Sequence, residues 1–181
     1  MKRMKFLLPV VLMITLCSFA AADWVVIQKK DAGFKISFPK NPEESNEDMP
    51  TDIGKITMHT LMYNITDGTD ENMTYGLIYM DYPADVINSD LKQDQLDLLF
   101  KSSIDGGAKN IEGKVVSIKN ATYKGYPGRL AKISFSEGIL NMKMYLVKNR
   151  MYIMESGSVA GKDNNKSTDK FFGSFELLTA K

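Results

Sequence analysis

The stretch that decides the fold is residues 129–158, RLAKISFSEGILNMKMYLVKNRMYIMESGS. It holds three apolar runs separated by short polar breaks, and in the first run Ala131, Ile133 and Phe135 alternate with polar residues. Such alternation is typical of a strand with one buried and one solvated face. The stretch therefore predicts three consecutive strands, at Arg129–Ser136, Leu140–Lys148 and Met151–Ser158.

Two tight turns are expected beside these strands. Asn149 separates the last two, where a hairpin needs a residue that tolerates a positive φ. Pro127 and Gly128 precede the first strand and suit a turn, because proline fixes one backbone angle and glycine is permissive.

Working outward, further strands are expected on the N-terminal side, and turn residues such as Asp67 and Gly68 favour a hairpin between two of them. The segment Asn41–Pro50 is acidic and poor in apolar residues, so we expect an exposed loop there. The predicted additional strands are Trp24–Gln28, Gly33–Phe38, Lys55–Ile65, Met73–Tyr82 and Lys114–Tyr123.

After Pro83 the apolar period becomes helical. Asp90 and Gln93 have the spacing of a capping box. We therefore predict a helix over about residues 90–105, ended by the glycine pair 106–107. The residues that recur at helical spacing are Leu96, Leu99, Phe100, Ser103 and Ile104.

The C-terminal segment Thr168–Leu178 carries three phenylalanines and predicts a short apolar helix or turn that docks on the sheet. Strands in antiparallel succession around helical segments indicate an α+β fold. We expect one antiparallel sheet of about six to eight strands with helices packed on it.

The N-terminus has the three-part pattern of a secretory signal: positive charge in residues 2–5, an apolar run at Phe6–Leu16, and a cluster of alanines. The apolar run is too short to span a membrane, which needs about 20 residues. We expect residues 1–22 to be a signal peptide, cleaved after Ala20 or Ala22, which leaves a single domain at 23–181 that is periplasmic or secreted.

Cys17 is the chain's one cysteine, and lipid-anchored bacterial proteins carry a cysteine as their first mature residue. Leu16 is bulky where such sites have a small residue, so we expect no lipid anchor. Cleavage after Cys17 would leave no thiol, which excludes disulfides, thiolate nucleophiles and cysteine-based zinc sites.

The charge balance argues against a nucleic-acid partner. Removing the signal leaves 20 basic and 22 acidic residues, a net charge of −2. Phosphate binding needs a net or clustered positive field. The remaining sequence also has no second apolar stretch long enough for a membrane span.

No catalytic residue or cofactor is predicted. His59 is the only histidine, and without a nucleophile motif it cannot form a Ser/His/Asp system. The segment 107–114 fails as a phosphate loop because its glycine spacing is wrong and Val115 replaces the required Ser or Thr. Acids and amides crowd the turn Asp67–Asn72, but they lack the spacing of a calcium loop.

Nine methionines remain after the signal, and thioethers suit soft metals such as Cu(I). Methionines in register with leucine and isoleucine on one strand face are more typical of core packing. A soft-metal or small-ligand carrier that uses methionines and His59 is therefore the alternative function. The methionines in such register are Met58 and Met62 in one strand and Met142 and Met144 in another.

Four phrases resemble the superfamily of the photosystem II extrinsic protein P (PsbP): Phe34-Lys-Ile-Ser-Phe-Pro, Gly125-Tyr-Pro-Gly-Arg129, Tyr145-Leu-Val-Lys-Asn-Arg-Met-Tyr152 and Phe171-Phe-Gly-Ser-Phe175. The resemblance implies a PsbP-like α/β/α sandwich with an antiparallel sheet between helices. It also implies a non-enzymatic binding or assembly role. Nothing in the sequence matches a photosynthetic partner surface, so that specific function is not carried over.

The leading hypothesis is an exported, non-enzymatic accessory module that binds a protein or envelope partner through its sheet edge and loops. Tyrosine and arginine are enriched at interface hot spots. The candidate partner-binding residues are Tyr123, Tyr126, Arg129 and Arg150. A third possibility is a hydrolase with a site dispersed along the chain.

Overall fold

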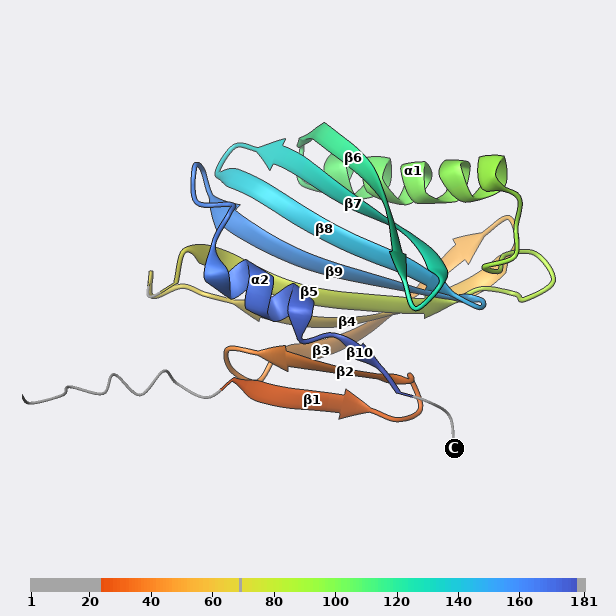
Figure 1. Ribbon diagram of the computed structural model, residues 1–181, viewed down its shortest axis with the longest axis horizontal. Coiled ribbons are helices and arrows are strands. Elements are labelled where there is room, and N and C mark those ends of the chain that lie inside the picture. The colour runs from red at the N-terminus through yellow and green to blue at the C-terminus, as the bar shows by residue number, and fades with distance from the viewer. Residues whose placement is uncertain (1–23, 69, 179–181) are drawn as a thin grey trace, which may run out of the picture.

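The computed structural model describes residues 24–68 and 70–178, which form three layers (Figure 1). A long helix, α1 (Gln93–Asn110), covers one face of a seven-stranded sheet. The opposite face carries a short helix, α2 (Lys166–Gly173), and a small three-stranded sheet. The predicted α+β class is confirmed, although the second outer layer combines a helix with strands.

The large sheet has the strand order β3-β4-β5-β9-β8-β7-β6, and every neighbouring pair is antiparallel. The three strands predicted from residues 129–158 lie side by side in it as β7, β8 and β9. The bounds are β3 (Glu43–Thr51), β4 (Gly54–Asn64), β5 (Asn72–Asp81), β6 (Lys114–Tyr123), β7 (Tyr126–Phe135), β8 (Gly138–Val147) and β9 (Arg150–Val159). The small sheet has the order β1-β2-β10, with β1 (Val25–Lys29), β2 (Phe34–Phe38) and β10 (Glu176–Leu177).

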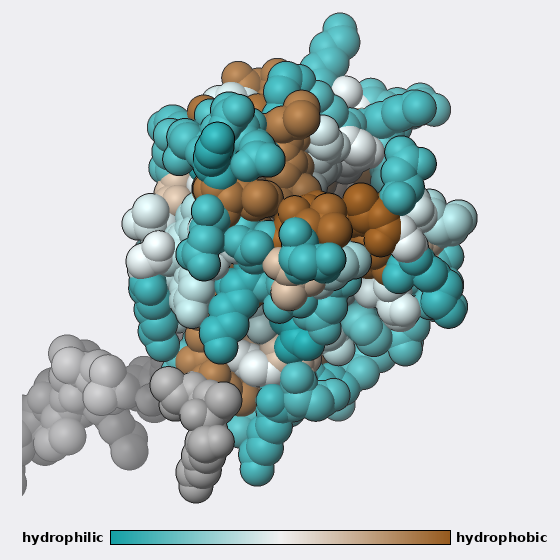
Figure 2. Space-filling model, turned by 90° about the vertical axis from the view of Figure 1, so that its right-hand side faces the viewer, coloured by the Kyte–Doolittle hydropathy of each residue, from teal (hydrophilic) through white to brown (hydrophobic). Residues whose placement is uncertain are grey.

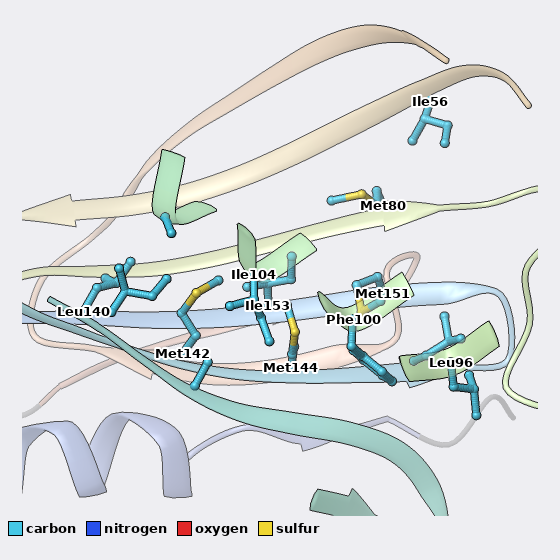
Figure 3. Close-up of a cluster of buried hydrophobic side chains, with 14 residues drawn as sticks. Ile56, Met80, Leu96, Phe100, Ile104, Leu140, Met142, Met144, Met151 and Ile153 are labelled. Atoms are coloured by element: carbon cyan, nitrogen blue, oxygen red, sulfur yellow. The ribbon is translucent and has the colours of Figure 1, made fainter. Parts of the chain in front are cut away.

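The layer between α1 and the large sheet is aliphatic and rich in methionine (Figure 3). Alternation along β8 and β9 directs every second side chain to this face. Complete burial of such a side chain contributes about 1.5 to 3 kcal/mol. Fully buried members include Phe100 and Ile104 of α1 and Met144, Leu146 and Met151 of the sheet.

The layer on the other face is aromatic. Phe34 and Phe38 of β2, together with Phe171 of α2, are fully buried against the tyrosines of β5 and β9. The ring centroids of Phe38 and Phe171 lie 5.1 Å apart in an edge-on arrangement. These contacts fix the small sheet and α2 onto the large sheet.

The prediction of a loop at Asn41–Pro50 is wrong, because most of this segment forms β3. This strand pairs with β4 from Glu43 opposite Met62 to Thr51 opposite Gly54. It is an edge strand with solvent on both faces, so it has no apolar alternation to reveal it. Charged side chains on such an edge discourage pairing with other chains.

The predicted ends of the first helix are also wrong. Its N-cap is Lys92, whose backbone N–H donates to the side chain of Gln95, so the Asp90–Gln93 capping box does not form. The helix continues through Gly106 and Gly107 to Asn110. A Cβ at Gly107 would lie 3.4 Å from the Met142 methyl carbon, which is an ordinary van der Waals contact.

The C-terminal segment Thr168–Leu178 is divided between two elements. Its first part completes α2, which begins earlier, at Lys166, with Asn165 as N-cap. Its last part forms β10 against β2.

The expected signal peptide, its cleavage after Ala20 or Ala22, and Cys17 lie outside the described residues. Within the described part, neither helix combines the length and apolar character that crossing a bilayer requires.

Candidate functional site

Five chain segments converge at one end of the sheet and line a pocket of about 590 Å³. They are the β1–β2 turn, the end of β5 at Asp81, the β6–β7 turn, the β8–β9 turn with the adjoining strand ends, and the C-terminal strand β10 with Leu178. Figure 2 looks onto this end, where hydrophilic side chains dominate the lower half of the view. We call this cavity the hairpin-end pocket.

The β8–β9 turn consists of Lys148 and Asn149, but Lys148 rather than Asn149 takes the positive φ, at 54°. The Asn149 side chain instead donates a hydrogen bond of 2.7 Å to the carbonyl of Tyr82. Its own carbonyl accepts from the Tyr82 backbone N–H at 2.9 Å. The turn is thus fastened to the end of β5, which leaves the exposed Lys148 side chain at the rim.

The β6–β7 turn lies at Lys124 and Gly125, both with positive φ, as a two-residue hairpin turn requires. The predicted turn at Pro127 and Gly128 is wrong, because both residues lie inside β7. Gly128 has another role: a Cβ there would come within 2.4 Å of the Met144 carbonyl oxygen. Only glycine permits this close approach of β7 and β8.

Arg150 forms one wall of the hairpin-end pocket. Its Nε and Nη2 donate to the two carboxylate oxygens of Asp81 at 2.5 and 2.6 Å. Nη1 donates to the carbonyl of Asp31 at 3.1 Å. The bond to Asp81 raises the pKa of Arg150 further. This paired fork geometry orients the guanidinium and neutralises most of its charge.

Tyr152 lines the pocket and anchors the β1–β2 turn. Its hydroxyl donates a hydrogen bond of 2.6 Å to the carbonyl of Ala32, in the β1–β2 turn. Burial raises the pKa of this phenol. Gly33 in turn accepts a hydrogen bond from the Leu178 backbone N–H at 2.8 Å. The small sheet and the C-terminal strand are therefore held against β9 at this point.

Of the four predicted partner-binding residues, Tyr126 and Arg150 line the same pocket. Tyr123 lies next to it but packs inward, with its ring 5.1 Å from Tyr145 and 5.7 Å from Phe175. Its hydroxyl donates to the Phe175 carbonyl at 3.2 Å. Tyr123 thus docks the C-terminal segment.

Arg129 does not belong to this surface. Only 5% of it is exposed, and it points to the opposite face of the sheet. Its guanidinium lies 4.9 Å from the ring centroid of Phe100 and pairs with Asp97 of α1. The expectation of an exposed partner-binding arginine is wrong here, because β7 directs this side chain under the helix.

His59 and most of the methionines lie on opposite faces of the large sheet. His59 stacks on Tyr79 with 4.5 Å between ring centroids, and its Nδ1 lies 2.7 Å from Asn46 Oδ1. Met58 and Met62 alternate with it and face the α1 side with Met142. The prediction that these methionines share a metal site with His59 is therefore wrong. Among the described residues, no group of three His, Cys, Asp or Glu side chains could hold a metal.

The polar turn before β5 belongs to a buried hydrogen-bond network. Asp70 accepts hydrogen bonds from the Asn72 backbone and from the Tyr75 hydroxyl, at 3.0 and 2.9 Å. Asn72 Oδ1 accepts from Asn165 at 2.9 Å and from Ser158 at 2.5 Å. This network connects the N-cap of α2 to β5 and β9.

Sequence reasoning missed two partly buried charged residues, Lys143 and Glu155. Burial lowers the pKa of Lys143 and raises the pKa of Glu155 to about 7. Both lie inside the apolar runs of residues 129–158. The sequence does contain a signal for them. Both faces of these strands are covered, so a charged residue inside such an apolar run indicates a charge that is removed from water.

The three-layer arrangement is that of PsbP-like proteins. The chain is similar to the solution structure of cyanobacterial PsbP (CyanoP) from Synechocystis sp. PCC 6803, with a TM-score of 0.51. The match covers 89% of this chain and 96% of that one, at 11% sequence identity. The resemblance predicted from short phrases is thus confirmed for the fold. No protein-family model and no curated protein sequence matches the chain.

Proposed function

We propose that this chain is an exported, non-enzymatic binding module, and that the hairpin-end pocket receives an acidic segment of a protein partner in the bacterial envelope. Residues 23–181 act as one module after cleavage beyond Ala20 or Ala22. The PsbP-like fold supports an accessory role, because the PsbP resemblance implies binding or assembly.

The proposal rests on a difference between two sets of polar groups around the pocket. Arg150, Asn149 and Tyr152 are engaged with other parts of the chain and hold the turns in place. Lys124 and Lys148 are exposed at the rim, and neither forms an ion pair within the described residues, although Lys124 Nζ donates to the Leu177 carbonyl at 3.4 Å. A cavity with two exposed lysines outside ion pairs at its rim suits a carboxylate-bearing segment.

Tyr126 adds an amphipathic contact at the same rim, since it is partly exposed and lines the pocket. Tyrosine offers a large contact area with little loss of side-chain entropy. An aromatic residue inside a polar, solvent-accessible rim is a common arrangement for protein recognition.

A matched charge-reversal experiment tests this function. The variant K124E/K148E should lose at least about 90% of the envelope protein that the immobilised wild type retains, because two attractive rim charges become repulsive. The control K114E/K166E changes the net charge equally at exposed sites away from the pocket and should retain wild-type binding. Equal retention by both variants would contradict the proposal.

A further inference from the structure

A second hollow, of about 280 Å³, lies beside α2 on the side of β6, β7 and β8 that faces away from α1. Its residues are distinct from those of the hairpin-end pocket. Lys119, Lys132 and Lys143 surround Leu130 on the strands, while Asp169 and Phe172 contribute from α2. We call this hollow the lysine groove.

The strand register brings the three lysines together. Lys119 lies opposite Leu130, and Leu130 lies opposite Lys143, so two ammonium groups flank one leucine across three neighbouring strands. Lys132 follows two residues after Leu130 and points to the same face. Directly paired positions have Cβ atoms about 5 Å apart, so the three side chains can reach one ligand.

Among the described residues, only one of these three lysines forms an ion pair with a nearby carboxylate. Lys132 donates to Asp163 at 2.5 Å and to Asn164 at 3.2 Å. Within the described part of the chain, Lys119 and Lys143 have no carboxylate within ion-pairing distance. Asp169 acts on Lys143 only at longer range.

Lys143 is held in an apolar setting. Its Nζ lies 5.4 Å from the ring centroid of Phe172, and burial opposes its charged form by lowering its pKa. Leu130 beside it remains 36% exposed. A partly desolvated ammonium group next to exposed apolar surface is costly without an anionic partner.

We propose that the lysine groove binds a small organic anion, namely a carboxylate attached to an apolar body of about the size of a bicyclic ring. The carboxylate lies between Lys119 and Lys143, and the apolar body covers Leu130 and the edge of Phe172. The volume is close to the lower limit of ligand pockets, about 300 Å³. This site goes beyond the proposed partner binding and does not depend on it.

NMR titration of the whole protein with 2-naphthoate tests the site, with 2-naphthamide as the neutral ligand of the same shape. For 2-naphthoate we expect saturable shifts confined to β6–β8 and α2, with a Kd on the order of 0.1 to 1 mM. The amide should bind at least about tenfold more weakly, because it lacks the charge-assisted hydrogen bonds.

The variant K143M keeps an unbranched side chain of nearly the same length and removes its charge, so the affinity for 2-naphthoate should fall at least about tenfold. K119Q should weaken binding in the same direction, whereas K114Q, at the far end of β6, should leave it unchanged. Unaltered spectra outside the groove would show that each variant is folded.

Three results would overturn the proposal. The first is an absence of saturable shifts with 2-naphthoate in the wild type, and the second is equal affinity for 2-naphthoate and 2-naphthamide. The third is saturation by a hexaglutamate peptide without any by 2-naphthoate, which would assign the groove to an acidic protein segment instead.

Discussion

At the scale of single residues, the burial of Glu155 makes the stability of the fold depend on pH. It faces α1 from β9, between Gly76 and Met142 in the register, and no described residue donates a hydrogen bond to it. Burial therefore raises its pKa from 4.5 to about 7. A carboxyl group with a raised pKa in the folded state favours folding when it is protonated.

From this shift we expect the free energy of unfolding to be highest, as far as Glu155 is concerned, below about pH 4.5. It should fall as the pH rises from 4.5 to 7, by about 3 kcal/mol at most, and then level off. E155Q should be more stable than wild type at pH 8 and lack this dependence. Urea unfolding between pH 5 and 8 measures this pH dependence of the free energy of unfolding, and Glu137→Gln at an exposed position is the control. Parallel pH profiles for wild type and E155Q would contradict the role of Glu155.

Asn165 is the residue on which α2 depends. Its Oδ1 accepts from the Thr168 backbone N–H at 2.8 Å, and its Nδ2 donates to Asn72 inside the buried network. Asn165→Ala removes the cap and leaves buried groups without partners, so it should cost about 2 to 4 kcal/mol. The neighbouring exposed Asn164→Ala should cost less than about 0.5 kcal/mol. Similar midpoints for both variants in urea would refute this role.

At the scale of elements, α1 makes a clear prediction because it continues through Gly106. A Cβ at this position meets no atom within 4 Å. Gly106→Ala should therefore stabilise the protein by up to about 1 kcal/mol through helix propensity alone. A lower melting temperature for this variant would show that the helix ends before residue 106, as the glycine pair had suggested from the sequence.

The elements that could be predicted are those in which the side chains of at least one face are buried. Residues 129–158 alternate between covered faces, so β7, β8 and β9 were found within a few residues of their true ends. The edge strand β3 has no such alternation, because both of its faces meet solvent. The predicted turn at Pro127 and Gly128 is wrong because Gly128 is required by a close strand approach. The turn at Asn149 is confirmed, but Lys148 takes the positive φ, while the Asn149 side chain bonds to Tyr82.

The candidate site was predictable only in part, for a similar reason. Tyr126 and Arg150 were identified by residue type alone, and the fold brings them together from different hairpins. The same reasoning failed for Arg129, because the face to which a strand residue points depends on the register. The lysine groove requires three strands in register, so no single segment could indicate it.

At the scale of the whole molecule, the two outer layers divide the surface of the large sheet. α1 covers a methionine-rich aliphatic face, while α2 and the small sheet cover an aromatic face (Figure 1). The converging turns at one end and the uncovered strands beside α2 remain accessible. We therefore expect partner recognition at the end and small-anion binding at the side to be independent, so that K124E/K148E leaves 2-naphthoate affinity unchanged.

The central claim is that the hairpin end is the partner-binding surface. Photo-crosslinking in the producing cells tests it most directly, with p-benzoylphenylalanine placed either at Tyr126 or at Leu98, which is 67% exposed on α1. We predict one dominant crosslinked protein from position 126, lost in the K124E/K148E background, and none of comparable yield from position 98. Equal crosslinking from both positions, or a yield at position 126 that is insensitive to charge reversal, would contradict the claim.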